Sequence, residues 1–405
     1  MGNLGIYVQV PFCQTKCTYC NFHTGVVASS RFAPYAEAVC REIRGHRELL
    51  PGAGVDWPGR LGRSTATVLQ MEGNPSCEDV MVDTVYIGGG TPSLLDPAHL
   101  QNILEAIRTT FGGELEEVTL EADPETVEEG KAAAWIKAGI NRVSFGLQSF
   151  SDKELIAAGR MHRKADIYRA VPILREAGIR SISFDLIAGL AHQTKESWRQ
   201  SLEELTVLAP EHLSIYLLEI DEGSRLGREL LQGGGKYSAG AVPSEDEMAE
   251  FYEMAQEVLG DTGYHHYEIS NWAKPGYESK HNLKYWRREA YLGFGAGAHS
   301  FSGTERWANA HDAAAYVSAV EGGRLPVEQH ERLTAESALE EELFLGLRQL
   351  DGIDLGRIER EYGVALAARF DRIASAGLVK IDGRMVRLAP DRLSVSNEVF
   401  VELMR

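Results

Sequence analysis

The first half of the chain repeats one pattern six times, and this repeat constrains the fold more than any other feature. Each repeat has a short apolar run rich in β-forming residues, a polar or glycine-containing turn, and an amphipathic stretch. Short, nearly continuous apolar runs are typical of parallel strands that helices cover. The runs span Ile6–Val10, Thr84–Ile87, Glu117–Leu120, Arg142–Phe145, Ser181–Phe184 and His212–Leu218.

The stretches between the runs carry apolar residues at three- and four-residue steps, which indicates helices. Gly139 and Gly178 stand directly after two of them, where helices commonly end. Alternating strands and helices predict an α/β fold with a parallel sheet and right-handed crossovers. Because a closed barrel of this kind needs eight units, we expect an open, partial (β/α)6 TIM-like barrel. The predicted helices span Ala33–Leu50, Pro97–Phe111, Pro124–Ala138, Ala165–Ala177 and Lys195–Leu208, and Pro51–Glu78 is expected to be an insertion or long loop.

The rest of the chain has a different character. We expect a barrel over residues 1–230, a barrel-capping mixed segment over 231–330, and a small C-terminal domain over 331–405. In the middle segment, Ser244 and Glu247 form a capping box that begins a helix. The last part has three helical stretches and then two short apolar runs around Asp382-Gly383, a strong hairpin signal. Helices followed by a hairpin predict a winged-helix-like domain.

Three cysteines follow the first predicted strand: Cys13, Cys17 and Cys20, with three and then two residues between them. Thiolates on one tight loop can hold three irons of a [4Fe-4S] cluster, which leaves the fourth iron open to a small chelating cofactor. The alternatives are a disulfide and a structural zinc site with His23 as the fourth ligand. Structural zinc prefers paired cysteines, and the sequence has no second pair.

Polar or glycine residues follow four successive predicted strands. The carboxyl ends of parallel barrel strands form the active site in this architecture, so these residues are expected to converge there. They are Gly88–Pro92, Glu121–Pro124, Gly146–Ser149 and Asp185. The cysteine spacing together with this pattern resembles radical S-adenosylmethionine (SAM) proteins. The resemblance implies that the open iron binds SAM and that an electron donor reduces the cluster, which then cleaves SAM to a 5′-deoxyadenosyl radical.

Eight segments spread along the chain narrow this resemblance. They are Ile6–Cys13, Tyr86–Ser93, Ser144–Phe150, Gly159–His162, Asp185–Leu190, His281–Trp286, Tyr291–Ser300 and Glu342–Asp354. They are similar to segments of oxygen-independent coproporphyrinogen III oxidases and of their relatives, the HemW-type heme chaperones. In SAM binding, Glu121 would accept hydrogen bonds from the amino group, Arg160 would pair with the carboxylate, and Asp185 would hold the ribose. The full set of SAM contacts that the resemblance implies is Tyr7, Gly89, Gly90, Thr91, Glu121, Gln148, Arg160 and Asp185.

One position separates these two kinds of relative. The oxidases have the motif C-x3-C-x2-C-x-C, whereas this sequence has Phe22 at the position of the fourth cysteine. The oxidases also have a longer segment before the tyrosine of the first strand, whereas only six residues precede Tyr7 here. Both features favour a chaperone that binds heme and transfers it to acceptor proteins. The alternative is a radical SAM enzyme acting on a porphyrin or heme, such as an oxidase, a methyltransferase or a ring-opening enzyme. His281 is the candidate heme ligand, because neutral imidazole is a common axial ligand. Its alternative role is that of a hydrogen-bonded structural residue.

The charge balance bears on partners. The chain has 59 Asp and Glu against 41 Lys and Arg, a net charge of −18, which disfavours nucleic acid and an anionic membrane surface. We therefore expect the last domain to bind other proteins. Peripheral contact with membrane proteins is compatible with this expectation. No apolar stretch reaches the roughly 20 residues that span a bilayer, and the start of the chain lacks the cationic region of a signal peptide. Cys40 and Cys77 are expected to be ordinary buried thiols, and the expected location is the cytoplasm.

Overall fold

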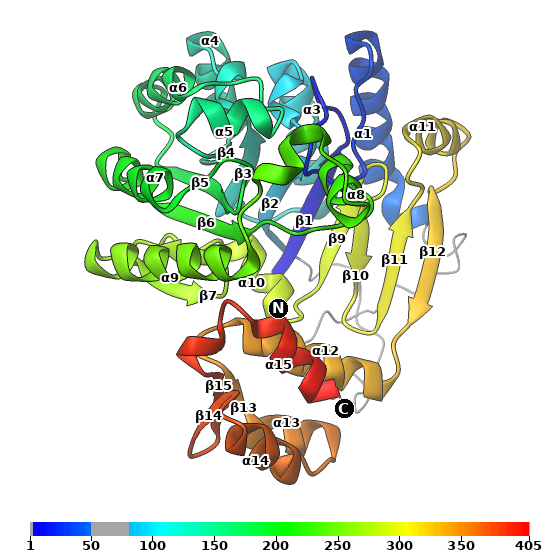
Figure 1. Cartoon of the computed structure of the whole chain (residues 1–405). Helices are drawn as coiled ribbons and strands as arrows, with labels where there is room; N and C mark the ends of the chain where they lie inside the picture. Colours follow the sequence, from blue (N-terminus) through cyan, green and yellow to red (C-terminus); the bar gives the residue numbers. More distant parts are fainter. Residues whose placement is uncertain (1–2, 50–80, 405) are drawn as a thin grey trace.

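The computed structural model describes residues 3–49 and 81–404, which are built around one large sheet (Figure 1). Its strands are β1 (Asn3–Val10), β2 (Met81–Gly89), β3 (Glu117–Ala122), β4 (Arg142–Gln148), β5 (Ser181–Ala188), β6 (His212–Leu217), β7 (His265–Glu268), β8 (Asn271–Ala273), β9 (Tyr291–Phe294), β10 (His299–Phe301), β11 (Glu305–Asn309) and β12 (Val327–Arg332). They pair in the order β12-β11-β10-β9-β1-β2-β3-β4-β5-β6-β8-β7. The strands β1 to β6 are consecutive parallel neighbours, as predicted.

Helices cover the outer side of these parallel strands (Figure 1). They are α1 (Phe32–Leu49), α3 (Pro97–Phe111), α4 (Glu129–Ala138), α6 (Lys164–Ala177) and α7 (Lys195–Leu208), whereas the short α5 (Asp152–Ala157) follows β4 and contacts the cysteine loop. The predictions for α3 and α7 match residue for residue. Gly139 and Gly178 cap α4 and α6 with φ values of 99° and 102°, a left-handed conformation that favours glycine. The helix predicted from Pro124 begins later, because Val127 and Glu128 are extended after a short 3-10 turn.

The sheet is open, because β7 and β12 form its two edges and do not pair with each other. The predicted open, partial barrel is therefore confirmed. The predicted insertion at Pro51–Glu78 lies outside the described residues, and so does Cys77. Of the helices in the described part of the chain, none is both long enough and apolar enough to cross a membrane.

The middle part of the chain extends the same sheet at both edges. β8 lies antiparallel beside β6, and β9 pairs in parallel with the outer side of β1. The strands β7 to β11 have three to five residues each, which is too short for alternation to reveal them in the sequence. α9 begins at the predicted capping box, where the Ser244 hydroxyl accepts a hydrogen bond from the Glu247 backbone N–H at 3.3 Å. The helices of this part are α8 (Arg225–Leu231), α9 (Glu245–Asp261), α10 (Lys280–Trp286) and α11 (Ala313–Glu321).

The last part combines helices with a small three-stranded sheet. Its elements are α12 (Ala335–Arg348), β13 (Ile353–Asp354), α13 (Leu355–Tyr362), α14 (Ala367–Ser375), β14 (Val379–Asp382), β15 (Met385–Leu388) and α15 (Ser396–Met404). The strands pair in the order β13-β15-β14, and the β14–β15 hairpin turns at the predicted Asp382-Gly383 position. This arrangement agrees with the winged-helix-like prediction. The sequence did not predict α15, which packs onto α12 with the rings of Phe400 and Phe344 4.5 Å apart.

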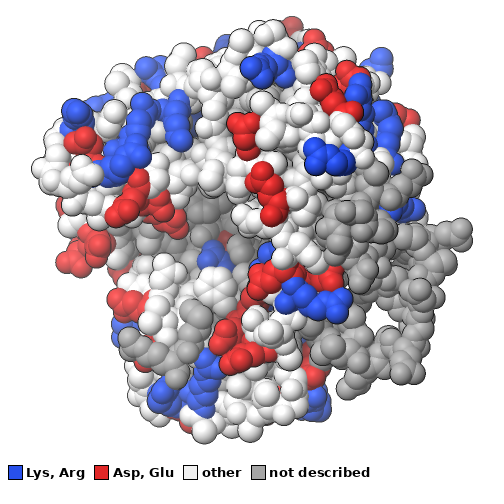
Figure 2. Space-filling view, turned by 90° about the vertical axis from the view of Figure 1, so that its right-hand side faces the viewer, with Lys and Arg blue, Asp and Glu red and all other residues white. Residues whose placement is uncertain are grey.

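One apolar core joins the barrel to the last part. Ile6 and Trp135 of the barrel belong to the same contiguous cluster of buried side chains as Leu347 and Phe370. Burying apolar surface is the main favourable term in folding, so this shared core holds the last part against the barrel. At the surface, acidic and basic side chains are interleaved over the face shown in Figure 2, and that face is hollowed near its middle.

Candidate functional site

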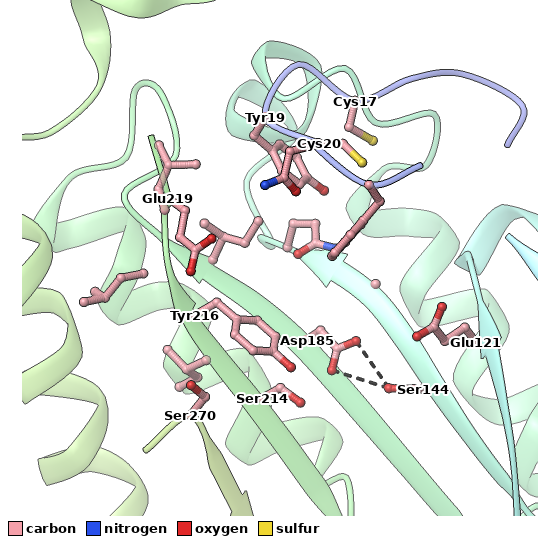
Figure 3. A pocket seen from close by; sticks show the side chains of 18 of the residues that line it. Cys17, Tyr19, Cys20, Glu121, Ser144, Asp185, Ser214, Tyr216, Glu219 and Ser270 are labelled. Carbon is pink, nitrogen blue, oxygen red and sulfur yellow. Dashed lines mark hydrogen bonds between the residues drawn. The ribbon is translucent and has the colours of Figure 1, made fainter. Parts of the chain in front are cut away.

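A cavity of about 1070 Å³ lies at the carboxyl ends of the parallel strands. It is lined by the cysteine loop, the segments that follow β2 to β6, the start of α9, the turn between β7 and β8, and residues 393–398 before α15. Figure 3 shows Cys17 and Cys20 on one side of this space and Asp185 and Glu121 across from them. Single-ligand pockets commonly measure about 300–1,000 Å³, so the cavity has room for more than one small molecule.

Backbone hydrogen bonds fix the cysteine loop to two other segments. The Thr18 N–H donates to the carbonyl of Ala158 at 3.0 Å, and the Thr18 carbonyl accepts from the Leu226 N–H at 2.8 Å. The loop therefore has a defined position between α5 and α8. Its three cysteines line the cavity and form no disulfide: Cys13, Cys17 and Cys20.

The surroundings of these thiols fit an iron–sulfur cluster. Burial raises the pKa of Cys13 and of Cys20. The thiolate is the form that binds metal, so these thiols need a positive partner before they ionise. The irons of a cluster supply that charge, and metal binding then releases the thiol protons. Arg160 adds a cation beside the loop, because its Nη1 donates to Cys17 Sγ at 3.5 Å.

The position of His23 bears on the zinc alternative. The ring of His23 lies 4.3 Å from the ring of His311, and His23 is not among the residues that line the cavity. Within residues 3–49 and 81–404, no three His, Cys, Asp or Glu side chains converge as ligands of one metal ion. A [4Fe-4S] cluster does not need three side chains to converge on one metal ion, because each cysteine binds a different iron. Cys40 is buried in the core, as expected for an ordinary thiol.

The glycines after β2 allow two parts of the chain to approach each other closely. A Cβ on Gly90 would lie 2.5 Å from the carbonyl oxygen of Phe12, and a Cβ on Gly89, whose φ is 106°, would overlap the Gln9 side chain. The Thr91 N–H also donates to the Phe12 carbonyl at 2.7 Å. Gly89, Gly90 and Thr91 line the cavity as predicted, but the space left by the glycines is filled by the chain itself.

Two half-buried carboxylates line the cavity, one near the end of β3 and one within β5. Glu121 accepts hydrogen bonds from the Gly89 N–H at 2.8 Å and from the Tyr86 hydroxyl at 2.9 Å, and burial raises its pKa to about 7. Asp185 accepts from the Ser144 hydroxyl at 3.3 Å, and burial raises its pKa to about 6 (Figure 3). Both carboxyls therefore favour a cationic or hydrogen-bonding ligand that would stabilise their ionised forms.

Arg160 has a partner that the sequence did not predict. Its guanidinium forms a short ion pair with Asp123 and donates to the carbonyl of Gly146 at 2.7 Å. Asp123 also accepts from the Thr91 hydroxyl at 3.1 Å, so it links Arg160 to the segment after β2. Asp123 belongs to the segment Glu121–Pro124 that the sequence placed at the carboxyl ends of the strands, but its pairing with Arg160 has no local signal.

Both Gln148 and Tyr7 are predicted contacts of SAM, but only Gln148 lines the cavity. Gln148 lines the cavity at the end of β4, where its φ of 67° marks a turn that few non-glycine residues adopt. Tyr7 is not among the lining residues, and its hydroxyl donates to Gln9 Oε1 at 2.7 Å. The neighbouring Tyr86, whose ring stacks 6.0 Å from that of Tyr7, occupies the cavity wall and contacts Glu121.

The structure argues against His281 as a heme ligand, which corrects the expectation drawn from the HNLKYW segment. The side chain is buried, with 1% exposure, and does not line the cavity. Its Nδ1 hydrogen-bonds Thr84 Oγ1 at 3.0 Å, and its Nε2 hydrogen-bonds the Tyr285 hydroxyl at 2.8 Å. Burial lowers its pKa to about 3, so the ring is neutral. Both ring nitrogens are thus used by the fold: Nδ1 ties α10 to β2, and Nε2 bonds Tyr285 within α10.

Another part of the cavity wall was missed entirely. Tyr216 lines it from β6, Met248 and Tyr252 from α9, and Arg348 from the end of α12, with residues 393–398 completing the wall. Figure 3 shows the Tyr216 ring extending beside Ser214 and Asp185. The alternation of a strand indicates Tyr216, which lies two residues after Ser214. The other lining residues come from segments far apart in the sequence, which carry no local signal.

Residues 7–205 match the Radical SAM superfamily, and residues 333–391 match the HemN C-terminal domain. The chain is 32% identical to the heme chaperone HemW of Bacillus subtilis (strain 168), over 97% of either chain. The chain belongs to the HemW heme chaperone family. It is also 33% identical to the heme chaperone HemW of Escherichia coli (strain K12), over 73% of this chain and 69% of that protein.

A solved structure shares the whole fold. Coproporphyrinogen III oxidase (HemN) from Escherichia coli, described as a radical SAM enzyme, matches with a TM-score of 0.78 at 21% identity, over 99% of this chain and 90% of that chain. Its likeness covers the barrel, the strands added at both sheet edges and the C-terminal part. The radical SAM assignment gives the chain its cofactors, a [4Fe-4S] cluster and SAM. When bound, they supply one-electron chemistry, and the protein positions them and excludes solvent.

Proposed function

We propose that this chain binds heme at the cavity that holds the cluster and SAM, and passes the heme to acceptor proteins. The observation that carries this proposal is the apolar character of the lining residues that remain exposed. Phe22 is 67% exposed, Met161 56%, Tyr216 43% and Ile220 42%, and all four line the cavity. Clustered exposed apolar side chains mark binding surfaces, and a flat macrocycle with apolar faces suits them.

In this proposal Cys13, Cys17 and Cys20 each hold one iron, and SAM binds the fourth. Glu121 accepts hydrogen bonds from the SAM amino group, and Arg160, positioned by Asp123, faces the SAM carboxylate. Burial and hydrogen bonding already place these groups on the wall of one cavity, which supports the assignment. The remaining SAM contacts proposed are Gly89, Gly90, Thr91, Gln148 and Asp185, with Tyr86 in the place expected for Tyr7.

Phe22 favours a chaperone over an oxidase. It occupies the position at which the oxidase motif has a fourth cysteine. It presents an apolar ring there instead of a thiol. We also propose that the partners of the chain are heme-accepting proteins and an electron donor for the cluster. Peripheral contact with membrane proteins and a cytoplasmic location belong to the same proposal. Curated relatives named heme chaperones support the heme partner.

The test is a hemin titration of anaerobically reconstituted protein, followed by the transfer of heme to an apo-cytochrome. Phe22→Ala is expected to weaken hemin binding about 10- to 150-fold, because burying a Phe side chain against the ligand is worth about 1.5–3 kcal/mol. Val207→Ala is the matched control, since Val207 is 72% exposed and does not line the cavity. Stoichiometric hemin binding without consumption of coproporphyrinogen supports the proposal, and decarboxylation of coproporphyrinogen refutes it.

The cluster assignment has a separate test. Cys17→Ala is expected to lose the iron, whereas Cys40→Ala is expected to retain it, because Cys40 is buried in the core away from the loop. Iron, sulfide and zinc analysis of both variants decides between the cluster and a zinc site. Zinc retained in the wild-type protein at one ion per chain would overturn the cluster assignment.

A further inference from the structure

One part of the cavity has no task in the SAM assignment. It is lined by α9, the turn between β7 and β8, the end of α12 and the loop at 393–398. Met248, Tyr252 and Ile269 give this part an apolar wall, and Leu393 and Val395 add to it from the C-terminal domain. Such a wall suits a large apolar body, whose orientation a few polar groups would then fix.

Among the described residues, four cationic side chains line the cavity: Lys16, Arg142, Arg160 and Arg348. Lys16 belongs to the cysteine loop, and Arg160 is held by its ion pair with Asp123. Arg142 is nearly fully buried, and its Nη1 already donates to Ser181 Oγ at 3.1 Å and to the Tyr277 carbonyl at 3.0 Å. These three side chains are therefore accounted for by the cluster half of the cavity or by the fold.

Arg348 is different, because its donors are mostly unused. Its Nη2 lies 3.5 Å from Glu268 Oε2, at the limit of a hydrogen bond. Its Nε is buried and has no hydrogen-bond partner among the residues that the structure describes. A guanidinium has five N–H donors in a planar fork that matches a carboxylate. Buried donors without partners are uncommon in native proteins, and each calls for an explanation such as a ligand.

The position of Arg348 is fixed before any ligand arrives. Its backbone carbonyl accepts from the Ile269 N–H at 3.0 Å, and the Leu350 N–H donates to the Tyr267 carbonyl at 3.1 Å. Its guanidinium also lies over the Trp286 ring, 4.6 Å from the ring centre. These contacts tie the end of α12 to β7 and α10, so the cation is pre-organised at the cavity wall.

We propose that Arg348 binds a carboxylate arm of the tetrapyrrole, whose apolar body lies against Met248, Tyr252 and Ile269. This inference rests on the proposed function. It places the ligand between the barrel and the C-terminal domain, and it gives that domain a direct part in ligand binding. The tetrapyrrole then extends from the exposed apolar side chains, Phe22 among them, to the wall that Arg348 lines, and SAM lies beside the cluster.

Hemin and hemin dimethyl ester, which lacks free carboxylates, test this assignment. Both are titrated into the reconstituted wild-type protein, Arg348→Gln and Arg348→Lys, with SAM affinity measured in parallel. Arg357→Gln is the matched control, because Arg357 belongs to the same domain, pairs with Glu342 at 2.6 Å, and does not line the cavity. Arg348→Gln is expected to weaken hemin binding about 10- to 100-fold, as for a charged hydrogen bond, and to leave ester binding within about twofold.

The outcomes separate the possible roles of the side chain. Arg348→Lys keeps the charge without the fork, so an intermediate loss of hemin affinity is expected with unchanged SAM affinity. Unaltered hemin binding in Arg348→Gln would overturn the proposal, and so would an equal loss of hemin and ester binding, which indicates a structural role. If the wild-type protein binds neither hemin nor its ester, the proposed function itself is wrong, and the role of Arg348 falls with it.

Discussion

We expect Glu121 to make SAM binding depend on pH, and one substitution isolates this effect. The carboxyl is half-buried, and the loss of solvent around it raises its pKa to about 7, although Gly89 and Tyr86 both donate to it. In the proposed site the SAM amino group donates to this carboxyl and so favours its ionised form. A carboxyl with a raised pKa holds its proton below that pH and must release it when SAM binds. SAM affinity therefore falls as pH falls through about 7.

The size of the effect follows from the same pKa. With a pKa of about 7, roughly one molecule in eleven has an ionised Glu121 at pH 6, and roughly ten in eleven have one at pH 8. The contribution of Glu121 to SAM affinity thus changes about tenfold over this range, or about 1.4 kcal/mol. Glu121→Gln keeps the shape and an acceptor oxygen but cannot ionise, so this contribution is absent from it at every pH.

Equilibrium binding of SAM to the two reconstituted proteins between pH 6 and pH 8 provides the measurement. The SAM amino group and Asp185 titrate in both proteins, so the ratio of the two Kd values isolates Glu121. The ratio of the variant Kd to the wild-type Kd is expected to rise about tenfold from pH 6 to pH 8. A ratio that stays constant over this range would refute the placement of Glu121 beside the SAM amino group.

Other predictions test the fold around the site. His281→Ala is expected to leave hemin affinity unchanged but to lower the free energy of unfolding by about 1–3 kcal/mol for each buried partner left unsatisfied, as measured with urea. Hemin loss at unchanged stability would contradict this. Gly90→Ala places a Cβ 2.5 Å from a backbone carbonyl of the segment after β1, so reduced iron retention is expected on elemental analysis. Burial raises the pKa of Glu42 from 4.5 to about 7. Its folded form holds the proton more tightly, so its contribution to stability is present below pH 4.5 and is lost as the pH rises to about 7, and Glu42→Gln should flatten this slope in urea unfolding. An unchanged slope would show that Glu42 does not titrate in this range.

Much of the barrel could be predicted because its signals are local. Each strand is a short apolar run, each helix has its own periodicity, and Gly139 and Gly178 mark helix ends by their conformational freedom. The convergence of Glu121, Gln148 and Asp185 followed from topology alone, since parallel strands bring their carboxyl ends to one edge.

The remaining features depend on contacts between distant residues. The ion pair of Arg160 with Asp123 joins positions 37 residues apart, and either residue alone resembles an ordinary surface charge. Arg348 reaches the cavity only because α12 packs against β7, which itself is too short to predict. His281 illustrates the opposite case, in which a suggestive motif serves the fold, because Thr84 and Tyr285 saturate both ring nitrogens.

The pairing of β1 has a consequence for how the protein acquires its iron. β1 leads into the cysteine loop and lies between β2 and β9, so its second neighbour comes from Tyr291–Phe294. A polypeptide that grows from its N-terminus exposes the three cysteines long before that strand, or the wall at 393–398, has been synthesised. Iron delivered during synthesis meets an open loop, whereas iron delivered afterwards must enter a walled cavity. The order of translation thus sets an early interval in which the thiols lack the neighbours that partly bury them in the folded chain.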